Sequence, residues 1–126
     1  MENKSLIKEK SFNFAIRIVN LYKYLNIKNE YIISKQVLRS GTSIGANVSE
    51  ALCGISRKDF LSKMYIAYKE AVETIYWIDI LYKSDFINKN EYTSIQKEAR
   101  EIYKMLSSIT KTTKTTPNSQ LLTPNS

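Results

Sequence analysis

The stretch LRSGTSIGANVSEA, at residues 38–51, restricts the fold of this chain most strongly. Apolar residues recur in it at helical spacing, yet Gly41 and Gly45 each cost roughly 1 kcal/mol in a helix interior relative to alanine. A loop is the alternative suggested by propensity alone, but the apolar spacing continues on both sides of the stretch. We therefore expect a helix with a few buried polar groups, whose small face lets a neighbouring helix approach closely and whose stability depends on that packing.

Helical periodicity continues through most of the chain and predicts four helices, with no alternating strand pattern to compete with it. Because the connections are short, we expect an all-α, antiparallel up-down-up-down four-helix bundle. Asn29, Ser56 and Asn88 are the expected N-caps, and Gly54 suits the position after the second helix. The expected helices lie at about residues 5–25, 30–52, 56–83 and 88–109.

The length of 126 residues predicts one domain, which we place at residues 1–110. Residues 111–126 are mostly Thr, Lys, Pro, Asn and Ser, with Leu121 and Leu122 as their only large apolar residues. Such a segment cannot bury enough apolar surface to order itself. We therefore expect a disordered C-terminal tail.

Cys53 is the single cysteine, which excludes an internal disulfide and favours a reducing compartment. Charges interrupt the first 25 residues, where no cleavage signal is recognisable. No apolar run of about 18 residues could cross a membrane. These features predict a cytoplasmic protein without membrane association.

The chain contains no histidine, which removes the Glu-x-x-His pairs of two-metal bundles and the usual base for a nucleophile. It also lacks the glycine motifs that bind phosphates or dinucleotides. Cys53 is either a nucleophile or a structural thiol, and the absence of an accompanying base favours the structural role. We expect no catalytic residue and no cofactor, which leaves an enzyme as the least supported function.

Acidic and amide side chains form one candidate polar cluster inside the bundle. Glu50, Glu70 and Glu73 could in principle hold a hard cation, with Asn47 one helical turn before Glu50. Alternatively, these groups satisfy one another across the second and third helices and set the register between them. We favour the second alternative, in which Asn47, Glu50 and Glu73 form a structural polar core without a metal.

Basic residues give the main functional signal in a chain of formal net charge +7. Four cations of the fourth helix fall within roughly 60° of arc, opposite its expected apolar seam: Lys97, Arg100, Lys104 and Lys111. Lys10 and Arg17 lie in a similar polar line on the first helix. Such stripes can follow a phosphate backbone without reading bases, whereas the alternative is a solvated surface that maintains solubility.

Nine tyrosines and one tryptophan are more than a single thin core requires. One alternative is that some of them stack on unpaired bases. The other is that they make subunit contacts, which we favour because Tyr and Trp are enriched at protein interfaces. The aromatic content therefore predicts a homo-oligomer.

The SIGAN-x-x-E segment, followed by Asp59-Phe60, Ala67 and the run KEAVETIYWIDIL, resembles the four-helix-bundle family of intervening-sequence proteins encoded within bacterial 23S ribosomal RNA genes. The resemblance covers roughly residues 5–110, with Asn47 and Glu50 at matching positions. It implies an antiparallel bundle that commonly forms a pentamer and has no known enzymatic activity. A related branch, the accessory proteins of diversity-generating retroelements, implies binding to nucleic acid and to a reverse transcriptase.

Two functional hypotheses follow from these observations. The first is a non-enzymatic, oligomeric bundle whose basic helix faces bind RNA or DNA, and one form of it is an accessory protein of a reverse transcriptase. The contacts would include Lys10, Arg17, Lys97, Arg100 and Lys104. The second is an assembly scaffold with no nucleic-acid role, whose charge serves only solubility.

Overall fold

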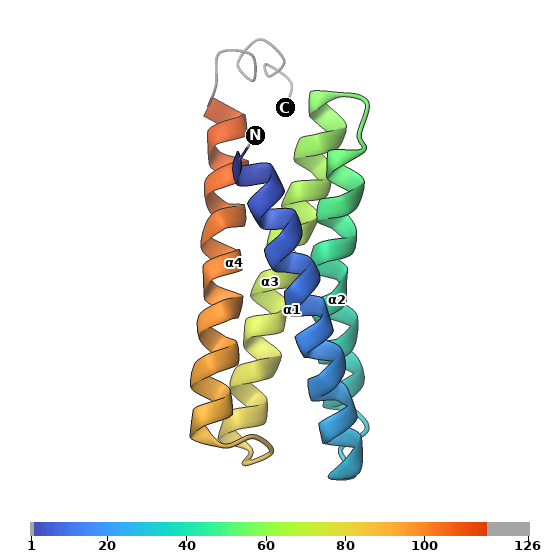
Figure 1. Cartoon of the computed structure of the whole chain (residues 1–126), viewed down its shortest axis with the longest axis vertical. Coiled ribbons are helices and arrows are strands. Elements are labelled where there is room, and N and C mark those ends of the chain that lie inside the picture. Colours follow the sequence, from blue (N-terminus) through green and yellow to red (C-terminus); the bar gives the residue numbers. More distant parts are fainter. Residues whose placement is uncertain (1, 116–126) are drawn as a thin grey trace.

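The computed structural model describes residues 2–115, with side chains described for residues 4–111. This part of the chain forms four helices and no strand, as Figure 1 shows. The helices are α1 (Glu2–Ile27), α2 (Ile33–Leu52), α3 (Arg57–Lys83) and α4 (Lys89–Thr115). They alternate in direction, which confirms the predicted all-α antiparallel four-helix bundle.

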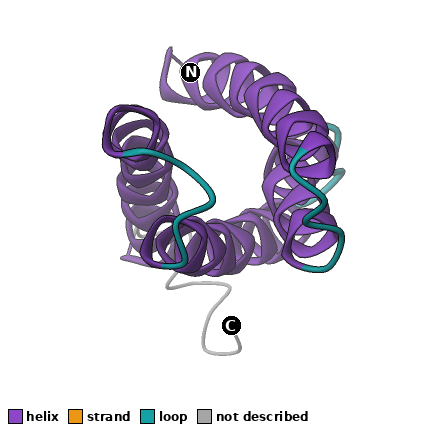
Figure 2. Cartoon of the chain, turned by 90° about the horizontal axis from the view of Figure 1, so that it is seen from below, coloured by secondary structure: helices purple, strands orange, loops and turns teal. Residues whose placement is uncertain are grey.

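Consecutive helices are neighbours around the bundle, whereas α1 and α4 pack together less extensively than the other neighbouring pairs (Figure 2). The core consists of apolar side chains from all four helices, most of which recur at helical spacing. Fully buried examples from the four helices are Phe14, Ile44, Met64 and Ile102. Burial of each such side chain contributes about 1.5–3 kcal/mol, so the shared core rather than local propensity stabilises the helices.

The glycine-containing stretch is helical and packs closely against α1, as predicted. A Cβ atom added at Gly41 would lie 2.8 Å from Cγ1 of Ile18, and one at Gly45 would lie 3.1 Å from the carbonyl oxygen of Ser11. A side chain at Gly41 would clash with Ile18, and one at Gly45 would require the α1 backbone to shift by a few tenths of an ångström. The two glycines therefore allow the α1 backbone to approach α2, and this contact offsets their low helix propensity.

Two of the three predicted N-caps are confirmed, and the third is wrong. Ser56 Oγ accepts a hydrogen bond from Asp59 N–H at 3.0 Å, and Asn88 Oδ1 accepts one from Glu91 N–H at 2.8 Å. Asn29 instead ends α1 with a φ of 64°, in the left-handed conformation that Asn tolerates. The first N–H groups of α2 bind the carboxylate of Glu30, which lies closest to Ser34 N at 2.6 Å.

Helix α2 ends at Leu52, as expected, but two details at the helix ends differ from expectation. Gly54 follows α2 but has no positive φ; it is needed for space, because a Cβ would lie 3.2 Å from the Ala51 carbonyl oxygen. The helix α4 continues to Thr115, beyond the helix end expected at about residue 109. The Thr110 hydroxyl binds the Leu106 carbonyl at 2.9 Å and is compatible with a continuing helix. Residues 116–126 of the expected tail lie outside the described residues.

Candidate nucleic-acid interface

The predicted basic line on α1 does not form a free cationic surface. Lys10 Nζ lies 3.5 Å from Glu101 on α4, and Arg17 Nη1 lies 2.8 Å from Glu98. Arg17 Nη2 also donates to Ser94 Oγ at 2.8 Å. These two candidates for nucleic-acid binding therefore join α1 to α4. The sequence did not show these pairings, because the carboxylates lie more than 70 residues further along the chain.

The basic stripe on α4 is exposed, as predicted. Ile95, Ala99, Ile102 and Leu106 are buried on one side of the helix, and Lys97, Arg100, Lys104 and Lys111 are exposed on the other. Among the described side chains, no carboxylate pairs with Lys97, Arg100 or Lys104. Their charge is consequently available to an anionic partner.

A chain of hydrogen bonds beside this stripe holds Arg100. Asp79 of α3 accepts from the Tyr92 hydroxyl at 2.7 Å and from Gln96 Nε2 at 3.0 Å. The Gln96 carbonyl oxygen then accepts from Arg100 Nε at 2.6 Å. The hydrogen bond to Asp79, together with burial, raises the pKa of Tyr92. Because Gln96 engages Nε, the two terminal nitrogens of the Arg100 guanidinium remain available for a phosphate.

Three tyrosines form a ladder between α3 and α4. The ring centroids of Tyr65 and Tyr68 are 6.0 Å apart, and those of Tyr68 and Tyr103 are 5.4 Å apart, with 24° between the planes in both pairs. A side-chain hydrogen bond with Tyr103, and then the charge of its phenolate, raise the pKa of Tyr68 above its ordinary value.

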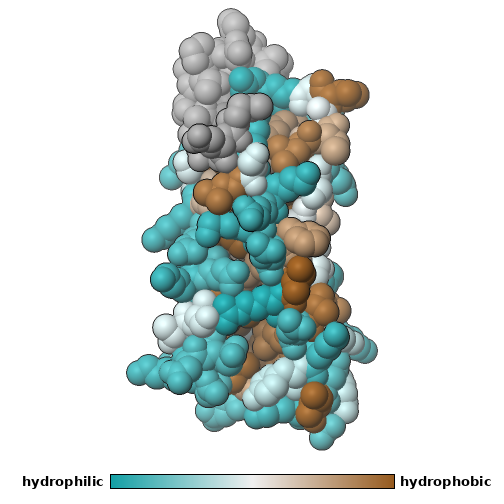
Figure 3. All heavy atoms as spheres, in the orientation of Figure 1, coloured by the Kyte–Doolittle hydropathy of each residue, from teal (hydrophilic) through white to brown (hydrophobic). Residues whose placement is uncertain are grey.

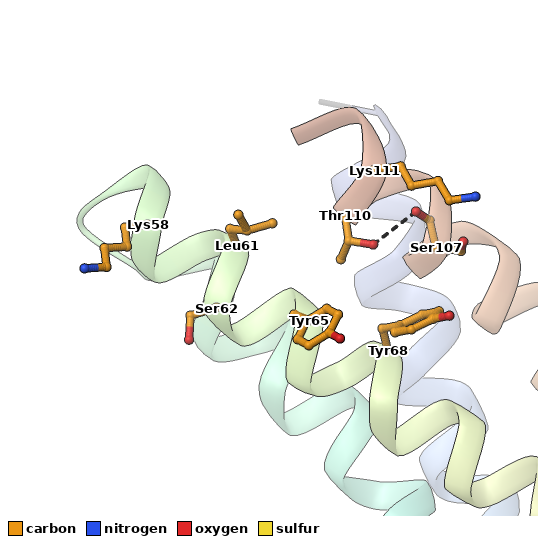
Figure 4. Close-up of a pocket in the computed structure, with 8 residues that line it drawn as sticks. All are labelled: Lys58, Leu61, Ser62, Tyr65, Tyr68, Ser107, Thr110 and Lys111. Atoms are coloured by element: carbon orange, nitrogen blue, oxygen red, sulfur yellow. Dashed lines mark hydrogen bonds between the residues drawn. The ribbon is translucent and has the colours of Figure 1, made fainter. Parts of the chain in front are cut away.

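A hollow of about 440 Å³ lies next to this ladder, between the N-terminal part of α3 and the C-terminal part of α4 (Figure 4). We call it the tyrosine hollow. Tyr65 and Tyr68 lie on its α3 side, with Leu61 further along the same helix. It is lined by Lys58, Leu61, Ser62, Tyr65, Tyr68, Ser107, Thr110 and Lys111. No carboxylate lines it, and cations stand on both helices.

A second hollow of about 350 Å³ adjoins the first and shares Ser107 and Lys111 with it. Tyr103, Lys104 and Ser108 complete its lining. The two hollows extend from the tyrosine ladder to the basic stripe of α4. We call the combined surface the α3–α4 face, and it comprises Lys58, Leu61, Tyr65, Tyr68, Lys97, Arg100, Tyr103, Lys104, Ser107 and Lys111. The tyrosine ladder itself could not be recognised from the sequence, because it joins two helices.

The predicted polar core of Asn47, Glu50 and Glu73 is wrong in its burial. Glu50 is exposed and pairs with Lys63 of α3 at 2.9 Å, while Asn47 Nδ2 donates within α2 to the Ser43 carbonyl at 2.8 Å. Glu73 is half-buried, pairs with Arg39 and accepts from Trp77 Nε1 at 2.9 Å. Glu50 and Glu73 therefore link α2 to α3 at the surface, where a charged group stays partly hydrated and avoids the cost of full burial.

The buried polar link between α2 and α3 is made by smaller groups. Thr74 Oγ1 donates to Ser40 Oγ at 2.9 Å, and both side chains are fully buried. Cys53 is exposed just after α2. Within residues 2–115, no group of three or more His, Cys, Asp or Glu side chains is placed to hold a metal. None of the helices in this range has an apolar stretch able to cross a bilayer.

The fold and the face together define an antiparallel four-helix bundle with an exposed cationic and tyrosine-lined surface. The chain belongs to the 23S rRNA-intervening sequence protein family, whose model matches residues 3–108. The resemblance read from the SIGAN-x-x-E segment is thereby confirmed at the level of the family. The link to the accessory proteins of retroelements stays a prediction.

A solved structure supports the same fold. The chain is similar to a protein of unknown function from the S23 ribosomal protein family of Bacteroides thetaiotaomicron, known from a crystal structure. The two are 51% identical, with a TM-score of 0.84 over 86% of this chain and 98% of the other. No curated protein matches the chain.

Proposed function

We propose that this protein is a non-enzymatic, cytoplasmic module that binds nucleic acid through the α3–α4 face. The observation that carries the proposal is the contrast between the two basic stripes. Carboxylates of α4 neutralise Lys10 and Arg17, whereas none of the described carboxylates pairs with Lys97, Arg100 or Lys104. The α4 stripe thus presents three exposed cations along one helix face, without a carboxylate partner in the part of the chain that the structure describes.

The dimensions of the stripe suit a phosphate backbone. Lys97 and Lys111 are separated by 14 residues, which corresponds to roughly 21 Å along a helix. Phosphates of one strand in a duplex are spaced at roughly 3.4 Å along the axis, so several of them can lie beside the stripe. Contacts of this kind supply affinity but no base specificity.

Charge reversal on the stripe tests this proposal. The variant Arg100→Glu/Lys104→Glu should remain folded, because both residues are exposed. Each lost phosphate contact should flatten the slope of log affinity against log salt by about one unit. Fluorescence anisotropy with labelled single-stranded and duplex RNA and DNA, at several salt concentrations, measures both the affinity and the slope.

Lys23→Glu/Lys35→Glu is the matched control, since it changes the net charge equally at exposed positions on α1 and α2. The proposal requires the α4 variant to lose more affinity and more salt slope than this control. Equal losses would show that only net charge matters, and unchanged binding in both variants would assign the α4 cations to solvent.

Assembly is the second candidate function, and apolar exposure on α1 favours it. Phe12 is 64% exposed and Ile16 is 50% exposed. Apolar side chains also interrupt the polar surface on the face drawn in Figure 3. Contiguous apolar patches mark interaction surfaces, so we propose self-assembly, as a ring of five by family resemblance. Light scattering of the parent and of Phe12→Ser/Ile16→Ser tests self-assembly. The mass of the assembly should fall in the variant only if Phe12 and Ile16 lie in a subunit interface.

Nucleic-acid binding and self-assembly are compatible functions. A more specific form of the nucleic-acid proposal is that the protein acts together with a reverse transcriptase. Copurification of this protein with a reverse transcriptase, from cells in which the two genes are neighbours, tests that partnership. A scaffold without a nucleic-acid role would assemble normally and bind neither RNA nor DNA above the level of the charge-matched control.

A further inference from the structure

We propose that the tyrosine hollow receives an unpaired base, so that the α3–α4 face selects single-stranded over duplex nucleic acid. This inference rests on the proposed function and specifies its substrate. It is built on three observations: an aromatic side, a space between two helices, and cations on both rims.

The aromatic side of the hollow is suited to stacking. Tyr65 is 51% exposed, so one end of the ladder is accessible from outside the bundle. Tyr68 packs against the Tyr65 ring and is itself packed against Tyr103, so the exposed Tyr65 ring is supported on its inner side. A base stacked on the exposed ring of Tyr65 would gain the sequence-tolerant stabilisation that single-strand-binding proteins obtain from aromatic residues.

The space accommodates a base but excludes a base pair in a helix. Leu61 projects from α3 towards α4, and Thr110 and Ser107 stand across from it (Figure 4). The volume of about 440 Å³ lies in the lower range of small-molecule sites. A stacked base within a duplex is held between its neighbours and cannot enter, so the nucleotide must be unpaired.

The cations stand where the backbone of such a strand would continue. Lys58 lines the hollow from the N-terminal end of α3, and Lys111 lines it from α4 (Figure 4). A single strand whose base enters the hollow would therefore pass from one cation to the other. From Lys111 the strand reaches Lys104, which lines the adjoining hollow. The cations of the face would contact the phosphates of the nucleotide, and the apolar, aromatic lining of the hollow would contact its base.

Tyr65→Leu tests the stacking while retaining an apolar side chain, with Tyr31→Leu as its control. Both tyrosines are 51% exposed, and Tyr31 lies in the connection between α1 and α2. Binding is measured with oligouridylate, with oligothymidylate and with a duplex of the same backbone. Loss of one stacking contact should weaken single-strand binding about 5- to 150-fold and leave duplex binding unchanged.

Ser107→Leu is a second variant that fills the hollow while keeping all three tyrosines. It should reproduce the loss of single-strand binding, and 2-aminopurine placed in the oligonucleotide should lose the fluorescence change that stacking produces. Thermal melting establishes that each variant is folded. Agreement between the two variants separates loss of the base site from a change in the ladder.

The outcomes distinguish this inference from the function on which it rests. If Arg100→Glu/Lys104→Glu weakens all binding while Tyr65→Leu and Ser107→Leu change nothing, the protein binds nucleic acid but the hollow holds no base. If the parent binds no nucleic acid, the proposed function and this inference fail together. If Tyr65→Leu lowers the oligomeric mass and weakens single-strand and duplex binding equally, the ladder is a subunit contact and the inference is overturned.

Discussion

Gly45 faces the backbone of Ser11 so closely that a Cβ atom would lie 3.1 Å from the Ser11 carbonyl oxygen. The contact involves a backbone atom, which cannot turn aside as the end of a long side chain can. The separation of α1 and α2 is therefore set at this point by the absence of a side chain.

Replacing Gly45 with leucine is expected to destabilise the bundle. A larger side chain must push α1 outward, and overpacking of this kind typically costs about 1–3 kcal/mol. Ala46→Leu is the control, because Ala46 is the next residue of α2 and is exposed. Chemical denaturation of both variants decides the matter: equal free energies of unfolding would mean that Gly45 does not set the helix separation.

The buried pair formed by Ser40 and Thr74 should show strong energetic coupling. Thr74→Val removes the hydroxyl that donates to Ser40 Oγ at 2.9 Å and leaves Ser40 short of a partner in a dry environment. This should lower the free energy of unfolding by about 1–3 kcal/mol. Addition of Ser40→Ala should recover part of the loss. Purely additive effects in this double-mutant cycle would contradict a direct interaction.

Arg17 is expected to contribute to stability and not to nucleic-acid binding. Its side chain is 29% exposed and pairs with Glu98, which is 30% exposed. Partial burial and a second bond to Ser94 make the loss in Arg17→Ala about 1 kcal/mol, above that of a fully exposed pair. Lys23→Ala, an exposed position on the same helix, should be nearly neutral. A selective loss of RNA or DNA affinity in Arg17→Ala would restore the original prediction for α1.

Alkaline pH should destabilise the bundle through Tyr92, whose hydroxyl is hydrogen-bonded to Asp79. The hydrogen bond to Asp79 raises the pKa of Tyr92 above its ordinary value of 10.0. Above pH 10, the unfolded chain therefore releases a proton that the folded chain still holds, and the free energy of unfolding falls as pH rises through the folded pKa.

The variant Tyr92→Phe measures this effect. It should remove one late-titrating phenol from the absorbance titration and reduce the alkaline loss of stability. If the absorbance titration of Tyr92→Phe still showed the same number of late-titrating phenols, the raised pKa of Tyr92 would be refuted. Because Asp79 also holds Gln96, the same variant should leave Arg100 in place.

Much of the fold could be predicted because it depends on local periodicity. Phe14, Ile44, Met64 and Ile102 recur at helical spacing, and each is buried in its expected helix. Caps made by residues adjacent to a helix, such as Ser56, were also predictable. The start of α2 was missed because the Glu30 side chain, rather than that of Asn29, reaches the free N–H groups.

The candidate site was predicted only in part, for a reason of distance along the chain. The exposure of Lys97, Arg100 and Lys104 follows from the apolar seam of a single helix, so the sequence alone determined it. The neutralisation of Arg17 by Glu98 and the stacking of Tyr68 on Tyr103 join residues of different helices. Helical spacing determines which side of a helix a residue occupies. Only tertiary packing decides which side chains face it across the bundle, and therefore which charges stay free and which aromatic rings form a surface.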